Sequence, residues 1–420
     1  MPTLSPVRPA DAAAYQRHHA AFMDALQAKT GDFSWYAEQF SPYPLLFDAA
    51  EVDNLAQLRA VIHRALLRVV NAYADDPRLA AVISLPPRHR ELLARARRLP
   101  YRVGSFRPDL LLDRAGVWRV CEINARFPLN GYVSSHYING FVGGLGYLAG
   151  SGAQAVAALD GLLEAIAGRF APGQPLVILR EREKGMDTHL LARELPRYGI
   201  PLRVRPPSAL TVRGGTVYDG EQAVGQFILE LERDELLGLN PELFDALAAC
   251  PTYFNDLRTL MLVHDKRMLA VLGDSDIMAD YLDEADRALL ARHVLPTYPA
   301  NDPRIAADLR TRPSDWVLKR NSSGRGIGML IGGECDASAW RQTLVEHADD
   351  YTAQRFLPQQ TLALPMLENG QLTERAMNVV AMLPGFDGEL FGPGFFRAGL
   401  DGIINVHGGR GEIVPAMLAA

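Results

Sequence analysis

Apolar residues recur at helical spacing along the first hundred residues. Between residues 55 and 73, leucine, isoleucine, valine and tyrosine repeat every three or four positions, opposite a face of arginine and histidine. Asp53 and Asn54 precede this run as helix caps. Two adjacent prolines interrupt the pattern before a second helical stretch at residues 88–98. The pattern predicts a mainly helical segment over residues 1–100.

Beyond residue 100, the spacing of apolar residues changes from that of a helix to that of β-strands. Residues 110–112 and 117–123 have the pattern of two strands and are joined by a polar turn that contains glycine, which predicts a β-hairpin. Glycine-rich residues 139–152 lead into a helix predicted at about residues 153–168, and a Pro-Gly pair at residues 172–173 marks a domain boundary.

Residues 174–250 have the alternation of a small α/β unit. Apolar strands are predicted at residues 176–179, 202–204 and 226–231, with a helix at residues 188–195 between the first two. A polar hairpin precedes the last strand. Units of this type bind ligands at the ends of their strands.

The remaining part alternates helices and strands again. Residues 256–272 have a helical pattern with a break at residues 264–265, and further helical segments extend to residue 293. An apolar strand at residues 316–319 runs into a glycine-rich loop, and a second strand follows at residues 329–331. Short strands with Gly and Pro turns continue to the C-terminus. The whole pattern predicts a chain of the α/β (α+β) class.

Composition and charge narrow the classes of function. The 420 residues are 48% hydrophobic and 22% charged, which excludes disordered and fibrous proteins. The net charge of −6 arises from residues spread along the chain without a basic block, so we expect no nucleic-acid partner. Residues 141–159 are uncharged but include five glycines, which makes them too polar for a membrane span, so we expect no membrane partner.

Cysteine and lysine usage adds two observations. The three cysteines, Cys121, Cys250 and Cys335, lie too far apart for a disulfide framework or a zinc ribbon. The wide spacing of the cysteines and the lack of an apolar signal-like core near the start favour a cytoplasmic protein.

The 43 basic residues include four lysines, which are Lys29, Lys184, Lys266 and Lys319. A lysine kept against an arginine-rich background indicates a site that needs a compact ammonium group. Chance is the alternative, above all for Lys29.

Polar residues gather on the predicted hairpin. Glu122 and Asn124 are two positions apart on one strand and therefore share a face, and the partner strand can present Asp109 beside them. Two carboxylates and an amide oxygen suit a hard cation such as Mg²⁺, which usually shares its remaining positions with phosphates. An edge strand with solvated polar residues remains the alternative.

Two lysines stand next to further signals. Lys319 ends an apolar strand beside the glycine-rich residues 324–328, whose backbone amides can approach phosphate closely. The spacing fits neither a Walker motif nor a dinucleotide fingerprint, and a plain hairpin turn is the alternative. Lys266 begins an apolar helical stretch and can reach a polyphosphate. The alternative is a surface lysine near a helix N-terminus, although a cation there opposes the helix dipole.

These three features, in this order, resemble the circularly permuted ATP-grasp ligases, namely the amide-forming domain of glutathionylspermidine synthetase and related amino-acid and peptide ligases. That family has Arg-x-Asp, a hairpin with Glu-x-Asn, a helix lysine and a strand lysine with a Gly-Arg-x-Gly loop. The resemblance covers about residues 101–420. It implies an ATP-grasp fold in circularly permuted order, preceded by the mainly helical segment.

The resemblance implies ATP and Mg²⁺ as cofactors and gives each matching residue a role. The implied metal ligands are Asp109, Glu122 and Asn124. The implied nucleotide contacts are Lys266, Lys319, Gly324, Arg325 and Gly326 at the phosphates and Gln354 at the adenine. The implied catalytic arginines are Arg107, which faces the transferred phosphoryl group, and Arg397, beside the acyl phosphate.

The sequence departs from the family pattern in three places. Arg126 stands where the family has an aspartate, and the glycine loop is one residue tighter. Residues 1–100 contain no cysteine, so the amidase domain of some members is absent. Glutathione and spermidine are therefore not implied as substrates.

The interpretation that follows is an ATP-dependent carboxylate-amine ligase, which forms an amide or peptide bond through an acyl phosphate. The substrates would be a small carboxylate and an amine, either an amino acid or a small peptide. Arg126, Arg180 and Arg233 are candidates to clamp a substrate carboxylate, because a guanidinium binds one in a bidentate manner. Each is alternatively an ordinary surface arginine.

Two alternatives stay open. In one, the enzyme joins an amino acid to the thiol of a carrier protein. In the other, the protein binds nucleotide without turnover.

We expect the chain to be divided into five segments. They are an N-terminal helical segment (1–100), a core with the metal-binding hairpin (101–170), a substrate-binding α/β unit (171–250), a lid with the nucleotide lysines (251–360) and a set of C-terminal strands (361–420).

Overall fold

The protein has a mixed α/β structure, as the hydrophobic pattern predicts. The computed structural model describes residues 4–30, 39–126, 131–155, 159–182, 187–250, 255–324, 326–404, 406 and 411–419. The α-helices are α1 (Ala12–Thr30), α2 (Ala49–Ala72), α3 (Pro77–Val82), α4 (Pro87–Ala96), α5 (Tyr132–Gly144), α6 (Leu159–Ala167), α7 (Thr188–Glu194), α8 (Arg233–Leu237), α9 (Pro241–Ala249), α10 (Met268–Gly273), α11 (Ser275–Met278), α12 (Glu284–His293), α13 (Ala306–Thr311) and α14 (Ala337–Glu346). Over these ranges, no helix combines the length and the apolar character that crossing a membrane requires.

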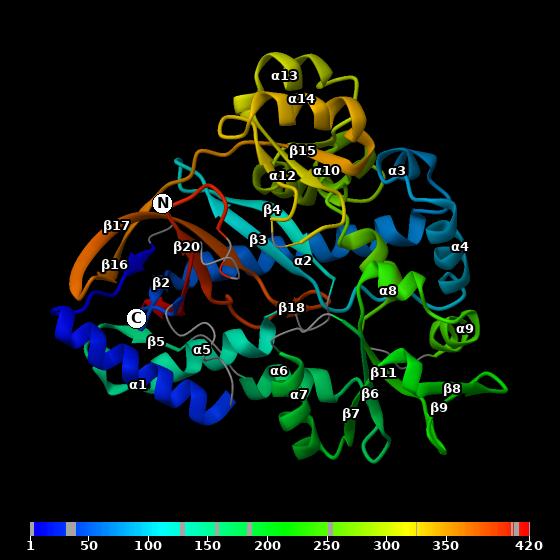
Figure 1. Ribbon diagram of the computed structural model, residues 1–420, viewed down its shortest axis with the longest axis horizontal. Coiled ribbons are helices and arrows are strands. Elements are labelled where there is room, and N and C mark those ends of the chain that lie inside the picture. Colours follow the sequence, from blue (N-terminus) through cyan, green and yellow to red (C-terminus); the bar gives the residue numbers. More distant parts are fainter. Residues whose placement is uncertain are drawn as a thin grey trace.

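The largest sheet is antiparallel and joins distant parts of the sequence (Figure 1). Its strands are β3 (Arg107–Leu112), β4 (Trp118–Asn124), β16 (Leu362–Glu368), β17 (Gln371–Met382), β20 (Phe396–Gly399) and β21 (Glu412–Val414). They run in the order β21-β20-β17-β3-β4, and β16 pairs with β17. The predicted hairpin is confirmed as β3 and β4. The C-terminal strands are not all short, because β17 extends over 12 residues.

A second antiparallel sheet lies above the first in Figure 1, under α13 and α14. Its strands are β12 (Thr297–Pro299), β13 (Trp316–Arg320), β14 (Leu330–Ile331) and β15 (Tyr351–Arg355), in the order β12-β15-β13-β14. It has its own hydrophobic cluster, which includes Trp316, Trp340 and Tyr351. The two predicted strands on either side of the glycine-rich loop are confirmed as β13 and β14.

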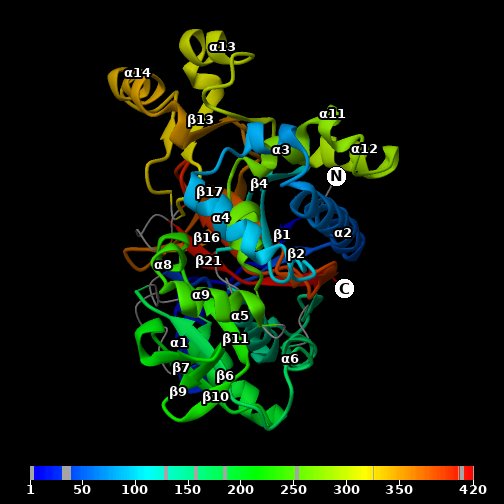
Figure 2. The same cartoon turned by 90° about the vertical axis from the view of Figure 1, so that its right-hand side faces the viewer.

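The predicted small α/β unit is also confirmed. Its parallel sheet has the order β11-β6-β7 and consists of β6 (Leu176–Arg180), β7 (Leu202–Arg205) and β11 (Gln226–Glu230). The polar hairpin forms a separate sheet of β8 (Leu210–Arg213), β9 (Thr216–Asp219) and β10 (Gln222–Val224). Figures 1 and 2 both place this green unit at the opposite end of the molecule from α13 and α14.

The remaining strands tie the chain ends to the core. A mixed sheet has the order β1-β2-β22-β5 and consists of β1 (Ser5–Pro6), β2 (Leu45–Phe47), β5 (Ala153–Gln154) and β22 (Ala416–Ala419). A short ribbon pairs β18 (Gly385–Phe386) with β19 (Glu389–Leu390). The main hydrophobic core includes residues from Leu45 to Ala416, so helices α2, α3 and α4 pack on the same core as the large sheet, whereas α1 belongs to a second cluster. The five-segment division stays a prediction.

Two predicted boundaries are wrong, and both for local reasons. Helix α2 begins before Asp53 and Asn54, because Asp48 caps it by accepting a hydrogen bond from the Ala50 amide. The glycine-rich stretch is partly helical, since α5 extends to Gly144 and buries most of its side chains. Residues 153–154, predicted to begin the next helix, instead form the short strand β5.

The predicted break after residue 263 is confirmed. A turn of π-helix at Thr259–Val263 precedes it, and regular helix resumes at Met268. The short segment between them carries His264 and Lys266.

Helix α2 holds the start of the hairpin through a buried cation. Arg59 is fully buried, donates to the carbonyl oxygens of Asp387 (2.6 Å) and Phe106 (3.4 Å), and lies 4.2 Å from the centre of the Phe106 ring. Burial lowers the pKa of Arg59 to about 10. Phe106 directly precedes β3, so this contact holds the start of the strand, where Arg107 lies, in place.

We expect Arg59→Ala to lower the free energy of unfolding by about 3 kcal/mol, because it leaves a cavity and buried carbonyl groups without their donor. Arg64→Ala on the same helix is the matched control. Arg64 forms an exposed ion pair with Asp286 at 2.6 Å, so its loss should cost about 1 kcal/mol or less. Urea unfolding monitored by circular dichroism measures both. Equal effects would show that Arg59 contributes no more than a surface pair.

Candidate functional site

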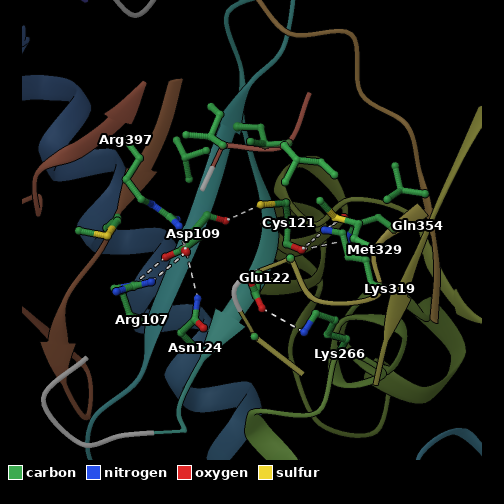
Figure 3. A pocket seen from close by; sticks show the side chains of 18 of the residues that line it. Arg107, Asp109, Cys121, Glu122, Asn124, Lys266, Lys319, Met329, Gln354 and Arg397 are labelled. Carbon is green, nitrogen blue, oxygen red and sulfur yellow. Dashed lines mark hydrogen bonds and ion pairs between the residues drawn. The ribbon is translucent and has the colours of Figure 1, made fainter. Parts of the chain in front are cut away.

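A cavity of about 300 Å³ lies between the six-stranded and four-stranded sheets. Strands β3, β4, β17 and β20 line one side, and β13, β14 and β15 line the other. The cavity also reaches the small α/β unit, where Asp187 and Glu230 line it. Figure 3 shows the charged side chains that point into this space.

The hairpin carries a buried ion pair into the cavity. In β3, Arg107 and Asp109 are two residues apart and share a face. The guanidinium of Arg107 donates to Asp109 through Nε to Oδ1 (2.8 Å) and through Nη2 to Oδ2 (3.0 Å). Asp109 is 1% exposed. Directly opposite, Asp109 pairs with Glu122 of β4, and the register shifts after this position.

Asp109 also gathers a side chain from the end of the sequence. Arg397 of β20 donates Nη2 to Asp109 Oδ2 (2.5 Å), and Asn124 donates Nδ2 to the same oxygen (3.0 Å). Figure 3 shows these groups converging on one carboxylate from both sides. Three of its hydrogen bonds therefore end on Oδ2, and one ends on Oδ1.

Glu122 projects into the cavity toward the predicted nucleotide lysines. Its Oε1 lies 3.1 Å from Lys266 Nζ. Burial alone would raise the pKa of Glu122, but the ammonium groups of Lys266 and Lys319 outweigh it and hold the pKa below its usual range. Lys266 is 8% exposed and also donates to the carbonyl of Ser323. The helix break after residue 263 is what lets it leave its helix and reach β4.

Lys319 is held at the other wall. Its Nζ donates to Gln354 Oε1 (2.7 Å) and to the carbonyl of Cys121 (3.2 Å). The amide of Gln354 donates in turn to the same Cys121 carbonyl (3.2 Å) and to Thr297 Oγ1 (3.0 Å). The side-chain oxygen of Gln354 thus orients Lys319, and the hydrogen bonds from its side-chain nitrogen hold Gln354 in place. Beyond it, the chain at Phe356 and Leu357 also lines the cavity.

The glycine-rich loop borders the same space. Gly324 and Gly326 both line the cavity. Gly326 has φ +70°, and a Cβ there would lie 3.3 Å from Cγ2 of Ile403, so this turn favours glycine. Arg325, predicted to contact phosphate, lies outside the described residues.

The three predicted carboxylate clamps occupy different places. Arg126 lines the cavity and pairs with Glu232 at 2.7 Å. Arg180 ends β6 and lies opposite Glu230 of β11 in the parallel register. Arg233 lies outside the cavity lining, donates to the Met261 carbonyl (2.6 Å) and lies 3.5 Å from Asp265.

The cavity residues that were not predicted from the sequence include Asp187, Glu230 and His264. Asp187 immediately precedes α7, and Glu230 is the last residue of β11. Strand ends and helix starts bind ligands in α/β units, so position in the predicted unit was a usable signal. His264 lay in the predicted helix break, but nothing in the sequence indicated that its ring faces the cavity.

Burial shapes the titration of all three. Burial raises the pKa of Glu230 to about 8 and that of Asp187 to about 6, and each carboxyl group is fully enclosed. Asp187 additionally opposes the ionisation of Glu230. Burial and then Lys266 lower the pKa of His264 to about 3, so its imidazole is neutral at pH 7.

The side chains suit a nucleotide with a bridging cation. Phosphate oxygens match the ammonium and guanidinium groups of the cavity, and Mg²⁺ is commonly held by one or two carboxylates together with phosphates. Glu122 and Asn124 offer oxygen atoms on one face, and Asp109 would reach a metal through Oδ1. Across the described ranges, no three His, Cys, Asp or Glu side chains form a metal cluster by themselves.

The chain is similar to known proteins in both sequence and fold. The profile of the family described as AnkG N-terminal domain matches residues 58–262. The ATP-grasp enzyme ankG of Aspergillus thermomutatus is 25% identical over 397 residues, which cover 80% of this chain and 81% of that protein. The solved apo structure of a glutathione synthetase-like effector, GSS30 of Globodera pallida, covers 96% of this chain and 97% of its own at a TM-score of 0.60 and 12% identity. The ATP-grasp resemblance and fold are thereby confirmed.

The raised pKa of Glu230 predicts a pH-dependent stability difference. Between the ordinary pKa of 4.5 and about 8, the unfolded chain releases this proton and the folded chain keeps it, so rising pH favours unfolding. We expect Glu230→Gln to gain stability relative to the wild type from pH 5 to pH 9, by a few kcal/mol, because each pKa unit is worth about 1.4 kcal/mol.

Urea unfolding at a series of pH values measures this difference. Glu221→Gln is the control, because Glu221 is an exposed carboxylate paired with Arg213 and its pKa is lowered. Its difference from the wild type should stay flat over this range. A flat curve for Glu230→Gln as well would mean that Glu230 ionises normally in the fold.

Proposed function

We propose that this ATP-grasp protein is an ATP-dependent carboxylate-amine ligase that forms an amide or peptide bond through an acyl phosphate. The observation that supports this most is the convergence of four cations, Arg107, Lys266, Lys319 and Arg397, on one cavity between two antiparallel sheets. Such a set neutralises a polyphosphate and a transferred phosphoryl group, and positioning with electrostatics is what phosphoryl transfer needs.

The four cations are held in place before any ligand binds. Asp109 fixes both arginines, and Glu122 and Gln354 each fix one lysine. Fixed cations need no rearrangement as charge moves from the nucleotide to the substrate carboxylate. In this proposal Lys266 and Lys319 bind the nucleotide phosphates, while Arg107 and Arg397 face the phosphoryl group in transfer.

The adenine end is assigned to the wall formed by β13, β14 and β15. Val317 of β13, Ile331 of β14 and Leu295, which precedes β12, give it apolar surface, and the backbone after Gln354 borders it. Glu122, Asn124 and Asp109 would hold Mg²⁺ at the phosphates. When bound, ATP with Mg²⁺ supplies the phosphoryl group that activates the carboxylate. Of the three arginines proposed as carboxylate clamps, Arg126 borders the cavity and is carried into this proposal.

The carrier-thiol and non-catalytic alternatives share these residues. A single assay separates them from the amide ligase. The purified protein is incubated with ATP, Mg²⁺ and hydroxylamine, and the twenty amino acids are offered one at a time as carboxylates. An acyl phosphate is trapped as a hydroxamate, with release of phosphate. Replacement of hydroxylamine by each amino acid in turn then reports amide formation.

We expect hydroxamate with a small set of carboxylates, and loss of activity in Glu122→Gln, which keeps the shape but removes the charge between the two lysines. Trapping without any amide product would favour a thiol acceptor. Nucleotide binding without trapping would favour the non-catalytic alternative. Full activity of Glu122→Gln at ordinary Mg²⁺ would remove Glu122 from the metal site.

Lys319→Arg should weaken ATP binding at least tenfold. The ammonium fits between the Cys121 carbonyl and Gln354 Oε1, whereas a planar guanidinium is wider and cannot replace a point charge there. Lys29→Arg is the matched control, since Lys29 is exposed at the end of α1. Calorimetric titration with a non-hydrolysable ATP analogue and Mg²⁺ measures both affinities. Unchanged affinity in Lys319→Arg would show that the site needs only a positive charge.

A further inference from the structure

The cavity has two ends of opposite chemistry. The end used in the proposed function carries the arginine and lysine cations described above. The other end, at the carboxyl edge of the parallel sheet, carries the carboxyl groups of Asp187 and Glu230. Nothing in phosphate binding requires buried acids, and they would repel a nucleotide. Their presence indicates a second ligand group of the opposite charge.

The two acids differ in how they are held. Asp187 is fixed, because it accepts hydrogen bonds from the amides of Val133 (3.2 Å) and Ser134 (3.0 Å) in the first turn of α5. Glu230 is 1% exposed, and its Oε2 has no hydrogen-bond partner among the residues that the structure describes. Buried polar atoms are nearly always satisfied, so this oxygen is directed at a group that a ligand supplies.

We propose that Glu230, with Asp187 behind it, is the acceptor subsite of this enzyme, where it binds the ammonium group of a primary amine and takes a proton from it. This rests on the proposed function. Glu230 touches the substrate and is therefore a catalytic residue, whereas Asp187 is a positioning residue that adds negative charge behind it.

The proton transfer balances as follows. In the empty cavity Glu230 is mostly protonated, and it loses that proton to solvent when the ammonium group binds beside it. The resulting carboxylate takes one proton from the ammonium group, which leaves a neutral amine. The nitrogen lone pair forms the C–N bond with the acyl carbon, the C–O bond to phosphate breaks, and the phosphate leaves with that electron pair. The second proton passes from nitrogen to the departing phosphate. Glu230 then returns its proton to solvent.

The electrostatic surroundings suit this step. A base is most effective when its pKa is close to that of the group it deprotonates, and the pKa of Glu230, about 8, is near the 7.7–8.0 of an α-amino group. Besides Asp187, the charged groups that act on Glu230 are Arg180 and Arg126, which favour its ionised form. A thiolate would be repelled by the same two acids, which favours an amine over a carrier thiol.

Two nucleophiles separate base catalysis from the phosphoryl-transfer step. Hydroxylamine is uncharged at neutral pH and needs no base, whereas an amino acid arrives as an ammonium ion. We expect Glu230→Gln to keep hydroxamate formation within about twofold of the wild type and to lose about 100-fold or more in amide formation. Glu221→Gln, on the surface of the same unit, should match the wild type in both reactions. Equal losses with both nucleophiles, or no loss, would overturn the proposal.

A binding measurement makes the test independent of turnover. Amino-acid amides carry an ammonium group without a carboxylate and are titrated into the protein by calorimetry. We expect at least one to bind the wild type and Glu221→Gln alike, and to bind Glu230→Gln at least tenfold more weakly. Binding that ignores Glu230, or no binding to the wild type, would overturn the amine subsite. Glu230-dependent binding without hydroxamate from any carboxylate would instead leave the subsite standing and refute the ligase function.

Discussion

The site depends on the buried carboxylate of Asp109. It accepts hydrogen bonds from Arg107 and Asn124 of the early hairpin and from Arg397 near the other end of the chain. Strands β3 and β20 are separated by β17, so the contact must span two strand spacings, or about 10 Å. Arginine is long enough to do this. One carboxylate thereby places two guanidinium groups side by side that would otherwise repel each other.

Charge in the cavity is arranged in compensated groups. Glu122 pairs with Lys266 and its carboxylate is also influenced by the charge of Lys319, and Gln354 gives Lys319 a neutral oxygen. Each cation therefore keeps an orienting partner while part of its charge still faces the cavity. At the far end, burial raises the pKa of Glu230 to about 8, so its proton stays on at neutral pH, whereas Asp187, with a pKa of about 6, is mostly ionised there. In our proposal, one end of the cavity thus binds anions and the other end binds a cation.

The comparisons bear on the fold of the whole chain. A glutathione synthetase-like structure shares the fold over nearly the whole chain at 12% identity, so the arrangement of sheets tolerates almost complete replacement of the sequence. The matched family profile, at residues 58–262, includes the small α/β unit, where Asp187 lies at a helix start and Glu230 at a strand end.

The sequence by itself determined the elements and the local motifs. Alternation predicted the hairpin that bears Asp109 and Glu122, the strand that ends in Lys319 and the helix break before Lys266, because these depend on neighbours within a few residues. Only the tertiary structure decided that Arg397 shares a carboxylate with Arg107 and that Glu230 faces the same cavity. It also decided that Arg233 lies outside that cavity. Those contacts depend on strand order and on burial across distant segments, for which a single sequence has no local signal.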